Sequence, residues 1–227
     1  MARRSTPLIS RENAARAALV VIDERGLDGW SLEEVAKLLG VRAPSLYHHF
    51  SGKSDLLAEV VKLILRDIAA PQIDDNDWKE TVMRLCLEAR QAILRHPQTA
   101  TLLLRFFPKQ FFIRAYDFWA SVCPFHQSVQ LVMLEGLEKL TFGSAVFAAA
   151  ERADGKTGYP PVDDQELPHL AGALAAGTMS DTELFAETVR RYLAGFRGSP
   201  LRGDITLPPG STTILLRRTH STGDADS

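Results

Sequence analysis

Residues 31–68 read SLEEVAKLLGVRAPSLYHHFSGKSDLLAEVVKLILRDI, and this stretch decides the fold. It opens with a capping-box signature, in which the Ser31 hydroxyl can accept from the Glu34 amide and the Glu34 carboxylate can accept from the Ser31 amide. Apolar residues follow at helical spacing, and Gly40 stands where a residue in the left-handed conformation ends a helix. We therefore expect a short helix that stops abruptly before Gly40.

A second short helix is expected after that turn. Pro44 lies in its first turn, where proline is tolerated best, and Leu46 and Phe50 lie four residues apart, which predicts that both face inward. Residues 42–53 hold two fixed positive charges and no carboxylate, so a polyanion can approach them without repulsion. Two short helices joined by a glycine-containing turn are typical of a helix-turn-helix, whose second helix reads the major groove of DNA.

The segment GVRAPSLYHHFSGKSDLL, residues 40–57, resembles the helix-turn-helix of the TetR family of one-component transcriptional regulators. The residues that carry the resemblance are Gly40, Val41, Pro44, Ser45, Leu46, Tyr47, Phe50, Lys53, Leu56 and Leu57. The resemblance implies that Tyr47 and Lys53 contact DNA phosphates, as the residue at the position of His49 often does. It implies base-facing positions for Arg42, Ala43, Pro44, Ser45 and His48. A solvated surface or an adventitious metal site also suits two adjacent histidines.

The composition is that of an ordinary soluble globular protein, with 227 residues, 45% hydrophobic and 24% charged. This length allows one domain or two modest ones. The formal net charge of −2 excludes a basic coat for nucleic acid. Positive charge is local instead, because residues 1–16 hold four arginines against one glutamate, a difference of +3.

The cysteines and the lengths of the apolar runs argue against a disulfide-rich protein and a membrane protein. Cys86 and Cys123 lie in unrelated contexts, which predicts buried structural thiols and no disulfide framework. No apolar run reaches the roughly 18 residues that span a bilayer, and no apolar segment follows the N-terminal arginines as in a signal peptide. We therefore expect no membrane association and a cytoplasmic protein.

The fold class is predicted to be all-α, with an N-terminal helix-turn-helix three-helix DNA-binding domain followed by a larger helical ligand-binding and dimerisation domain. The DNA-binding domain is expected at 1–53, a connecting helix capped by Ser54 at 54–70 and the regulatory domain at 71–198. The last part, 199–227, has no aromatic residue and is rich in Pro, Gly, Ser and Thr. It is expected to be mostly disordered, with a possible short strand over 212–216.

Within the regulatory part, helical periodicity interrupted by prolines predicts helices over 78–96, 98–107, 109–122, 128–152 and 180–198, and a loop over 153–166. The helix over 128–152 contains Gly136 and Gly143, each costing about 1 kcal/mol of helix propensity. We therefore expect another helix or a ligand to approach this helix closely.

The last two of these helices suit self-association, because the final one carries an apolar stripe rich in aromatic residues. The resemblance implies a homodimer formed through two helices per subunit as a four-helix bundle. The expected dimerisation residues are Gly136, Leu140, Phe185, Val189, Tyr192 and Phe196. The same stripe also suits the core of a single chain.

Aromatic residues crowd the segment 106–119, which contains a proline and lies between histidines at 96 and 126. Large aromatic side chains with a few polar groups suit a small-molecule site, and they suit an ordinary core equally well. The candidate ligand-binding residues are His96, Leu103, Phe107, Phe111, His126, Met133 and Glu135.

Two later segments, ARQAILRHPQTATLLL at 89–104 and LFAETVRRYLAGF at 184–196, are similar to the tetracycline-repressor branch of the family. That branch coordinates a ligand-bound divalent metal through a histidine. Matching residues 92–94 to its pattern places Leu103 where the histidine stands. A leucine cannot ligate a metal, so a metal–tetracycline chelate is not expected and the effector stays open.

No catalytic motif with a credible partner occurs, so we expect no enzyme, no cofactor and no metal site. The sequence predicts a ligand-responsive, DNA-binding transcriptional regulator, a repressor that a small-molecule effector releases from a palindromic operator and that acts as a homodimer. Two alternatives remain open. One is a helical small-molecule-binding or catalytic domain with a vestigial DNA reader, and the other is a helix-turn-helix regulator controlled by a protein partner.

Overall fold

The computed structural model describes residues 9–68, 77–153, 155 and 158–196, and every regular element in these ranges is a helix. The elements are α1 (Arg11–Gly29), α2 (Leu32–Leu38), α3 (Ala43–Leu46), α4 (Lys53–Arg66), α5 (Trp78–Leu94), the 3-10 helix η1 (Pro97–Thr99), α6 (Leu102–Phe106), α7 (Lys109–Ser121), α8 (Gln127–Ala153), α9 (Pro168–Ala176) and α10 (Asp181–Ala194). The predicted all-α class is confirmed. Residues 1–8, residues 69–76 around the expected domain boundary, and the expected tail lie outside the described residues.

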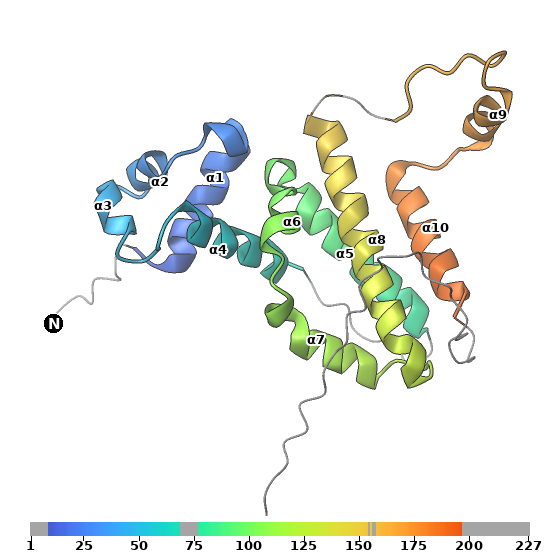
Figure 1. The fold of residues 1–227 in the computed structure, drawn as a ribbon, viewed down its shortest axis with the longest axis horizontal. Coiled ribbons are helices and arrows are strands. Elements are labelled where there is room, and N and C mark those ends of the chain that lie inside the picture. Colours follow the sequence, from blue (N-terminus) through green and yellow to red (C-terminus); the bar gives the residue numbers. More distant parts are fainter. Residues whose placement is uncertain (1–8, 69–76, 154, 156–157, 197–227) are drawn as a thin grey trace, which may run out of the picture.

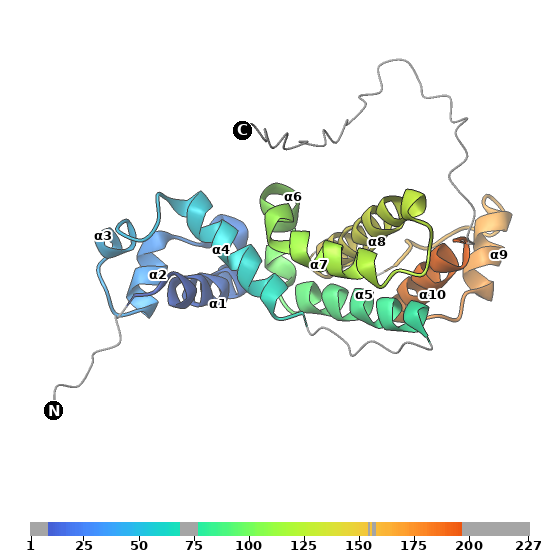
Figure 2. The same cartoon turned by 90° about the horizontal axis from the view of Figure 1, so that it is seen from below.

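The helices form an elongated molecule with α1–α3 at one end and α9 and α10 at the other (Figures 1 and 2). Helix α4 leaves the N-terminal unit and runs toward α5 and α6 in the middle of the molecule. The described chain therefore contains a small helical unit, a connecting helix and a larger helical bundle, in the order that the sequence predicts.

Small residues let α1 lie close to α4. Helix α1 begins after Ser10, whose hydroxyl accepts a 3.0 Å hydrogen bond from the Asn13 amide, and it buries alanines at 14, 15, 17 and 18. Leu56 and Val60 of α4 are completely buried in the same core. Gly26 has φ +75° and interrupts α1 near its end, in a conformation that glycine adopts without steric cost.

The cap of α2 forms only in part as predicted. The Ser31 hydroxyl accepts from the Glu34 amide at 3.2 Å, but the Glu34 carboxylate pairs with Arg25 of α1 and does not close the capping box. The long arginine reaches across between helices, which a pattern local to α2 cannot reveal. Gly40 has φ +70° and ends the helix in the left-handed conformation that the sequence predicts.

Helix α4 differs from its prediction at both ends. It begins at Lys53 with Gly52 as the capping residue, so Ser54 is not the cap, and it ends at Arg66. One continuous core joins its buried face to α1–α3, to η1 and α6, and to Ala145, Ala148 and Ala149 of α8. The N-terminal unit is thus packed directly on the larger bundle through α4.

A second core lies between α5, α8 and α10, and it explains part of the aromatic stripe of α10. Its fully buried members include Met133, Val189 and Leu193, and Phe185 is only 5% exposed. Arg90 is also completely buried here, where it donates to Ser144 at 2.9 Å and to Asp181 at 2.7 and 2.8 Å. These contacts fix the first turn of α10 against α5 and α8.

Helix α9 was not predicted. Pro168 opens it, as proline often opens a helix, but none of its residues is buried. It lies beyond the first turn of α10, at the margin of the molecule (Figure 1). A short helix with no buried face lacks the periodic signal on which sequence-based prediction depends.

Candidate functional site: nucleic-acid interface and internal cavity

Helix α3 lies at one end of the molecule (Figure 1). Leu46 and Phe50 are 1% and 3% exposed and anchor it in the core, as predicted, whereas Tyr47 is 58% exposed. Arg42, Pro44, His48 and Lys53 are also exposed, and Ala43, Ser45 and His49 are partly exposed. The residues that sequence analysis assigns to DNA therefore lie together on one accessible surface, which we call the reading surface.

Lys53 is oriented by contacts that leave its charge intact. Its ammonium donates to the Trp30 carbonyl at 3.2 Å and lies 4.9 Å from the centre of the Trp30 ring. Neither partner carries a negative charge. The lysine is thus held at the edge of the reading surface with its positive charge available to an anion.

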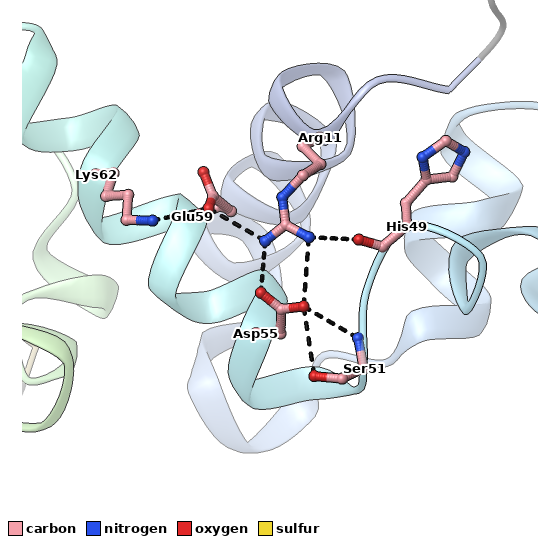
Figure 3. A network of polar contacts seen from close by, with 6 residues as sticks. All are labelled: Arg11, His49, Ser51, Asp55, Glu59 and Lys62. Carbon is pink, nitrogen blue, oxygen red and sulfur yellow. Dashed lines mark hydrogen bonds and ion pairs between the residues drawn. The ribbon is translucent and has the colours of Figure 1, made fainter.

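Arg11 joins the first turns of α1 and α4 to the turn that follows α3 (Figure 3). Its guanidinium donates to the His49 carbonyl, pairs with Asp55 and lies 3.1 Å from the Glu59 carboxylate. It also lies 4.5 Å from the centre of the Phe50 ring. We call this set of contacts the Arg11 network.

The electrostatics of the Arg11 network follow from these contacts. The hydrogen bond from Arg11, followed by the Ser51 amide at 3.0 Å, lowers the pKa of Asp55 to about 2. Arg16 pairs with Glu12 at 2.8 Å. Both described arginines of the N-terminal charge cluster are therefore paired with carboxylates, and the local positive charge inferred for this end is smaller than the arginine count suggests.

A cavity of about 240 Å³ lies inside the larger bundle, between the end of α4 and the faces of α5, α7 and α8. Its lining is mostly aliphatic and aromatic: Leu65, Ile68, Trp78, Val82, Leu85, Cys86, Ala89, Phe112, Ala115, Tyr116, Trp119, Leu134, Leu137, Glu138, Thr141 and Phe142. Such an apolar enclosure with a few polar groups is typical of a small-molecule site.

The polar groups of the cavity are few and mostly buried. The Tyr116 hydroxyl donates to the Glu138 carboxylate, and burial, followed by this bond, raises the pKa of Tyr116 strongly. Burial also raises the pKa of the Cys86 thiol to about 11, so this cysteine is a neutral wall residue, as predicted for a structural thiol. The chemistry that the cavity offers is hydrogen bonding and charge recognition in an apolar enclosure.

Most predicted ligand residues lie outside the cavity lining. The His96 ring pairs with Asp23 of α1 at 2.6 Å, Leu103 is buried in the first core, and His126 is exposed and bonds to Ser128. Met133 is buried in the second core and Glu135 pairs with Lys109 at the surface. The side chain of Phe111 lies outside the described residues.

Among the predicted ligand residues, Phe107 packs directly behind the cavity lining. The centre of its ring lies 5.6 and 4.9 Å from the ring centres of Phe112 and Phe142, which do line the cavity. The lining residues that sequence reasoning missed recur at helical spacing, as 112, 115, 116 and 119 in α7 and 134, 137, 138, 141 and 142 in α8. That periodicity is visible in the sequence, but it does not say which helices face one another.

The predicted dimerisation residues divide into two groups. Phe185 and Val189 are buried within the chain, and Phe196 packs on Phe125 and Tyr192. Leu140 is partly exposed beside a second, smaller groove between α8 and α10.

Gly136 is covered by its own chain. The Tyr192 hydroxyl donates to the Val132 carbonyl at 2.8 Å, and a β-carbon placed on Gly136 would lie only 1.8 Å from the Tyr192 oxygen. The close approach expected at this glycine is therefore made by a tyrosine side chain from α10. A β-carbon on Gly143, in contrast, would meet nothing within 4 Å.

Two further classes of site are absent from the described ranges. They contain no group of three or more His, Cys, Asp or Glu residues arranged to hold a metal ion. Among the same residues, no helix combines the length and the apolar character needed to cross a bilayer.

Comparison with known proteins agrees with this arrangement. Residues 15–60 match the model for bacterial regulatory proteins of the tetR family. The class D tetracycline repressor of Escherichia coli is 28% identical over 170 residues, 71% of this chain and 76% of the repressor. The class A tetracycline repressor from transposon 1721 of Escherichia coli is 34% identical over 90 residues, 38% of this chain and 41% of the repressor.

Solved structures share the same fold. A possible TetR family transcriptional regulator from Streptomyces coelicolor A3(2) superposes with a TM-score of 0.69 at 26% identity, covering 82% of this chain and 98% of that one. ActR of Streptomyces coelicolor, solved in complex with actinorhodin, gives a TM-score of 0.67 at 20% identity over 82% of this chain and 96% of ActR. Residues 15–60 thus match the tetR-family DNA-binding model, and the chain as a whole is similar in sequence and fold to TetR-family regulators.

Proposed function

We propose that the chain is a transcriptional repressor that binds a palindromic DNA operator as a homodimer and leaves it when a small molecule fills the cavity. The observation that carries this proposal is the position of α4. Asp55, in its first turn, is tied through Arg11 to the His49 carbonyl at the end of α3, while Leu65 lines the cavity at its other end. One helix thus touches both the reading surface and the cavity.

The reading surface supports DNA binding through its shape and its charge. Tyr47 and Lys53 are accessible at its edge and suit contacts with phosphates, which set affinity and register. Ser45 and His48 lie on the accessible side of α3, where they can donate to base edges in the major groove. A helix of only four residues leaves few side chains for base contacts, so phosphates supply much of the affinity.

Exposed apolar residues support association through α8 and α10. Val132 and Phe147 of α8 are 46% and 76% exposed, and Leu184 of α10 is 59% exposed. Gly143 lies on α8 with open space around it, which allows a second helix to approach closely. The groove of about 200 Å³ beside Leu140 can receive a side chain from a second copy. These residues replace the buried Phe185 and Val189 in the proposed interface.

Dimerisation sets the distance between the two copies of α3. Two copies of α3 related by a two-fold axis can enter successive major grooves only when they lie about one helical turn of DNA apart, roughly 34 Å. A ligand in the cavity contacts Leu65 and Ile68 directly and can change that separation by moving α4. The ligand shifts DNA affinity only by its differential affinity for the two arrangements.

Relatives support the same function. The class D and class A proteins of Escherichia coli are named tetracycline repressors, and ActR has been solved with actinorhodin bound. The apolar cavity favours a small-molecule effector over control by a protein partner alone, because a protein partner needs no such concave apolar site.

The proposal is tested by selecting an operator from random duplex DNA with the purified chain and measuring its affinity by fluorescence anisotropy at several salt concentrations. We expect a palindromic consensus, a 2:1 complex by sedimentation and a log–log slope of about −0.9 per neutralised phosphate. Binding that does not change with salt, or selection of a single half-site by a monomer, would contradict the proposal.

A further inference from the structure

The cavity contains one carboxylate among its described lining residues, that of Glu138 on α8. Its side chain is 14% exposed, so it is largely removed from water. A carboxylate in such a place is costly unless a positive charge or hydrogen-bond donors face it. The partners of Glu138 therefore indicate what the cavity is built to receive.

Those partners compensate the charge of Glu138 only in part. One oxygen accepts from the Tyr116 hydroxyl, and the other lies 3.9 Å from the Lys109 ammonium. Lys109 is itself 58% exposed and makes its closer pair, at 2.9 Å, with Glu135. The phenol of Tyr116 remains protonated, because burial and the Glu138 carboxylate raise its pKa. The Glu138–Tyr116 pair thus retains a negative charge at the wall of the cavity.

Aromatic rings form much of the remaining wall. Five aromatic residues from three helices line the cavity: Trp78, Phe112, Tyr116, Trp119 and Phe142. Aromatic faces carry negative potential and attract organic cations, most strongly where water is excluded. A carboxylate beside several aromatic faces recognises positive charge by two independent interactions.

One hydrogen-bonding group of the cavity wall has no partner among the described residues. The Trp78 indole nitrogen is buried there without an acceptor, whereas the Thr141 hydroxyl interacts with the Cys86 thiol. An indole N–H can only donate. The wall therefore also suits a ligand that carries an acceptor atom away from its positive end.

We propose that the effector is a compact organic cation, an aromatic or alicyclic amine or quaternary ammonium compound, whose positive group lies against Glu138 and the aromatic walls. This inference rests on the proposed function, because it names the ligand class of the same cavity. The volume of about 240 Å³ lies below the roughly 300–1,000 Å³ of sites for drug-sized ligands, so the ligand is small. Anions are disfavoured by repulsion from Glu138.

The test uses three probes of similar size that differ in charge: phenyltrimethylammonium, its neutral isostere tert-butylbenzene, and benzenesulfonate. Their binding to the full-length chain is measured by tryptophan fluorescence, since Trp78 and Trp119 line the cavity. We expect the cation to bind about tenfold or more tightly than the neutral isostere, and benzenesulfonate to bind most weakly. Equal binding of the cation and its isostere, tighter binding of the anion, or no binding of the cation would each overturn the inference.

Variants identify the source of the selectivity. In Glu138→Gln, which keeps the shape of the side chain, the preference for the cation should fall about tenfold. Glu88→Gln, on the exposed side of α5, should retain the preference of the natural chain. Thermal melts establish that both variants fold, and unchanged selectivity in a folded Glu138→Gln chain would overturn the assignment to this carboxylate.

Operator binding separates this inference from the proposed function. If the neutral isostere releases the operator as well as the cation does, the cavity is an effector site without charge selectivity, and only the present inference fails. If the chain binds no operator while the cation binds selectively, the proposed function fails and the ligand class stands.

Discussion

The Arg11 guanidinium lies 3.1 Å from the Glu59 carboxylate and also donates to the His49 carbonyl, so one side chain joins α4 to the turn that follows α3. Asp55 completes the contact from the first turn of α4 (Figure 3). A displacement of α4 must therefore either carry α3 with it or break the Arg11 network. In the proposed repressor, this network makes the reading surface respond to the cavity.

Replacing Arg11 by methionine should weaken operator binding although Arg11 is paired with carboxylates and not placed to meet DNA. The variant leaves Asp55 and Glu59 without their arginine and frees the His49 carbonyl, so we expect a loss of about 1 kcal/mol in stability and about fivefold or more in affinity. Fluorescence anisotropy and urea unfolding measure both. Arg16→Met is the matched control, because Arg16 forms only a surface pair with Glu12 on α1. Equal losses in the two variants would dismiss the special role of Arg11.

The Asp55 carboxyl should make stability depend on pH in a defined range. Its pKa in the folded chain is about 2, below its ordinary value of 3.8, so its contribution is fully present above about pH 4 and is lost as pH falls toward 2. Urea midpoints of the natural chain and of Asp55→Asn should therefore differ at pH 6 and converge between pH 4 and 2. A difference that stays constant over this range would show that the paired charge is not responsible.

Sequence reasoning located the helices whose signals are local. Gly40, Pro44 and the apolar spacing through Phe50 predict the helix-turn-helix correctly, because turn chemistry and core positions lie within one short segment. The cavity could not be located in the same way. Its lining residues come from four helices and are spread over positions 65–142 of the chain. Periodicity predicts the inward face of each helix, but it does not predict which other helix packs against that face.

Single partners across the chain were also hidden from the sequence. His96 suits a pocket by composition, but it pairs with Asp23, which lies 73 residues away. Gly136 was expected to permit the close approach of another helix or a ligand, and the approaching group is Tyr192 of α10 in the same chain. Such outcomes depend on which helices meet, and the spacing of residues along one helix does not determine that.

Gly136→Ala should be destabilising and Gly143→Ala should not, although both lie in α8. A β-carbon at Gly136 would lie 1.8 Å from the Tyr192 oxygen and would displace that ring, which overpacking data place at about 1–3 kcal/mol. At Gly143 the β-carbon meets nothing within 4 Å, and alanine improves helix propensity by about 1 kcal/mol. Urea unfolding of the two variants at low protein concentration compares them. Similar stabilities would mean that Tyr192 does not pack on Gly136 as described.

The division of roles on the reading surface can be tested with two alanine substitutions. Lys53→Ala should weaken binding to all DNA sequences by a similar factor and reduce the salt slope by about one, because it removes a phosphate contact. Ser45→Ala should change sequence preference at one position of each half-site if Ser45 donates to a base. Binding to a panel of operator variants measures both effects. If the two variants show the same pattern across the panel, Ser45 is not a base reader.

Phe147→Asp should give a folded monomer with poor operator affinity. Phe147 is 76% exposed on α8, in the apolar surface with Gly143 and Leu184 that we assign to association, and an aspartate there would have to be buried against a second copy. Sedimentation velocity measures the oligomeric state, and anisotropy measures operator affinity.

The matched control is Leu104→Asp on α6, because Leu104 is equally exposed at 76% but lies outside the proposed interface. A Phe147→Asp chain that stays dimeric would move the interface away from this part of α8, whereas dissociation of the Leu104→Asp chain would move it to α6. Since half-sites on one duplex are read together, a monomer should also lose the preference for palindromic over single half-site DNA.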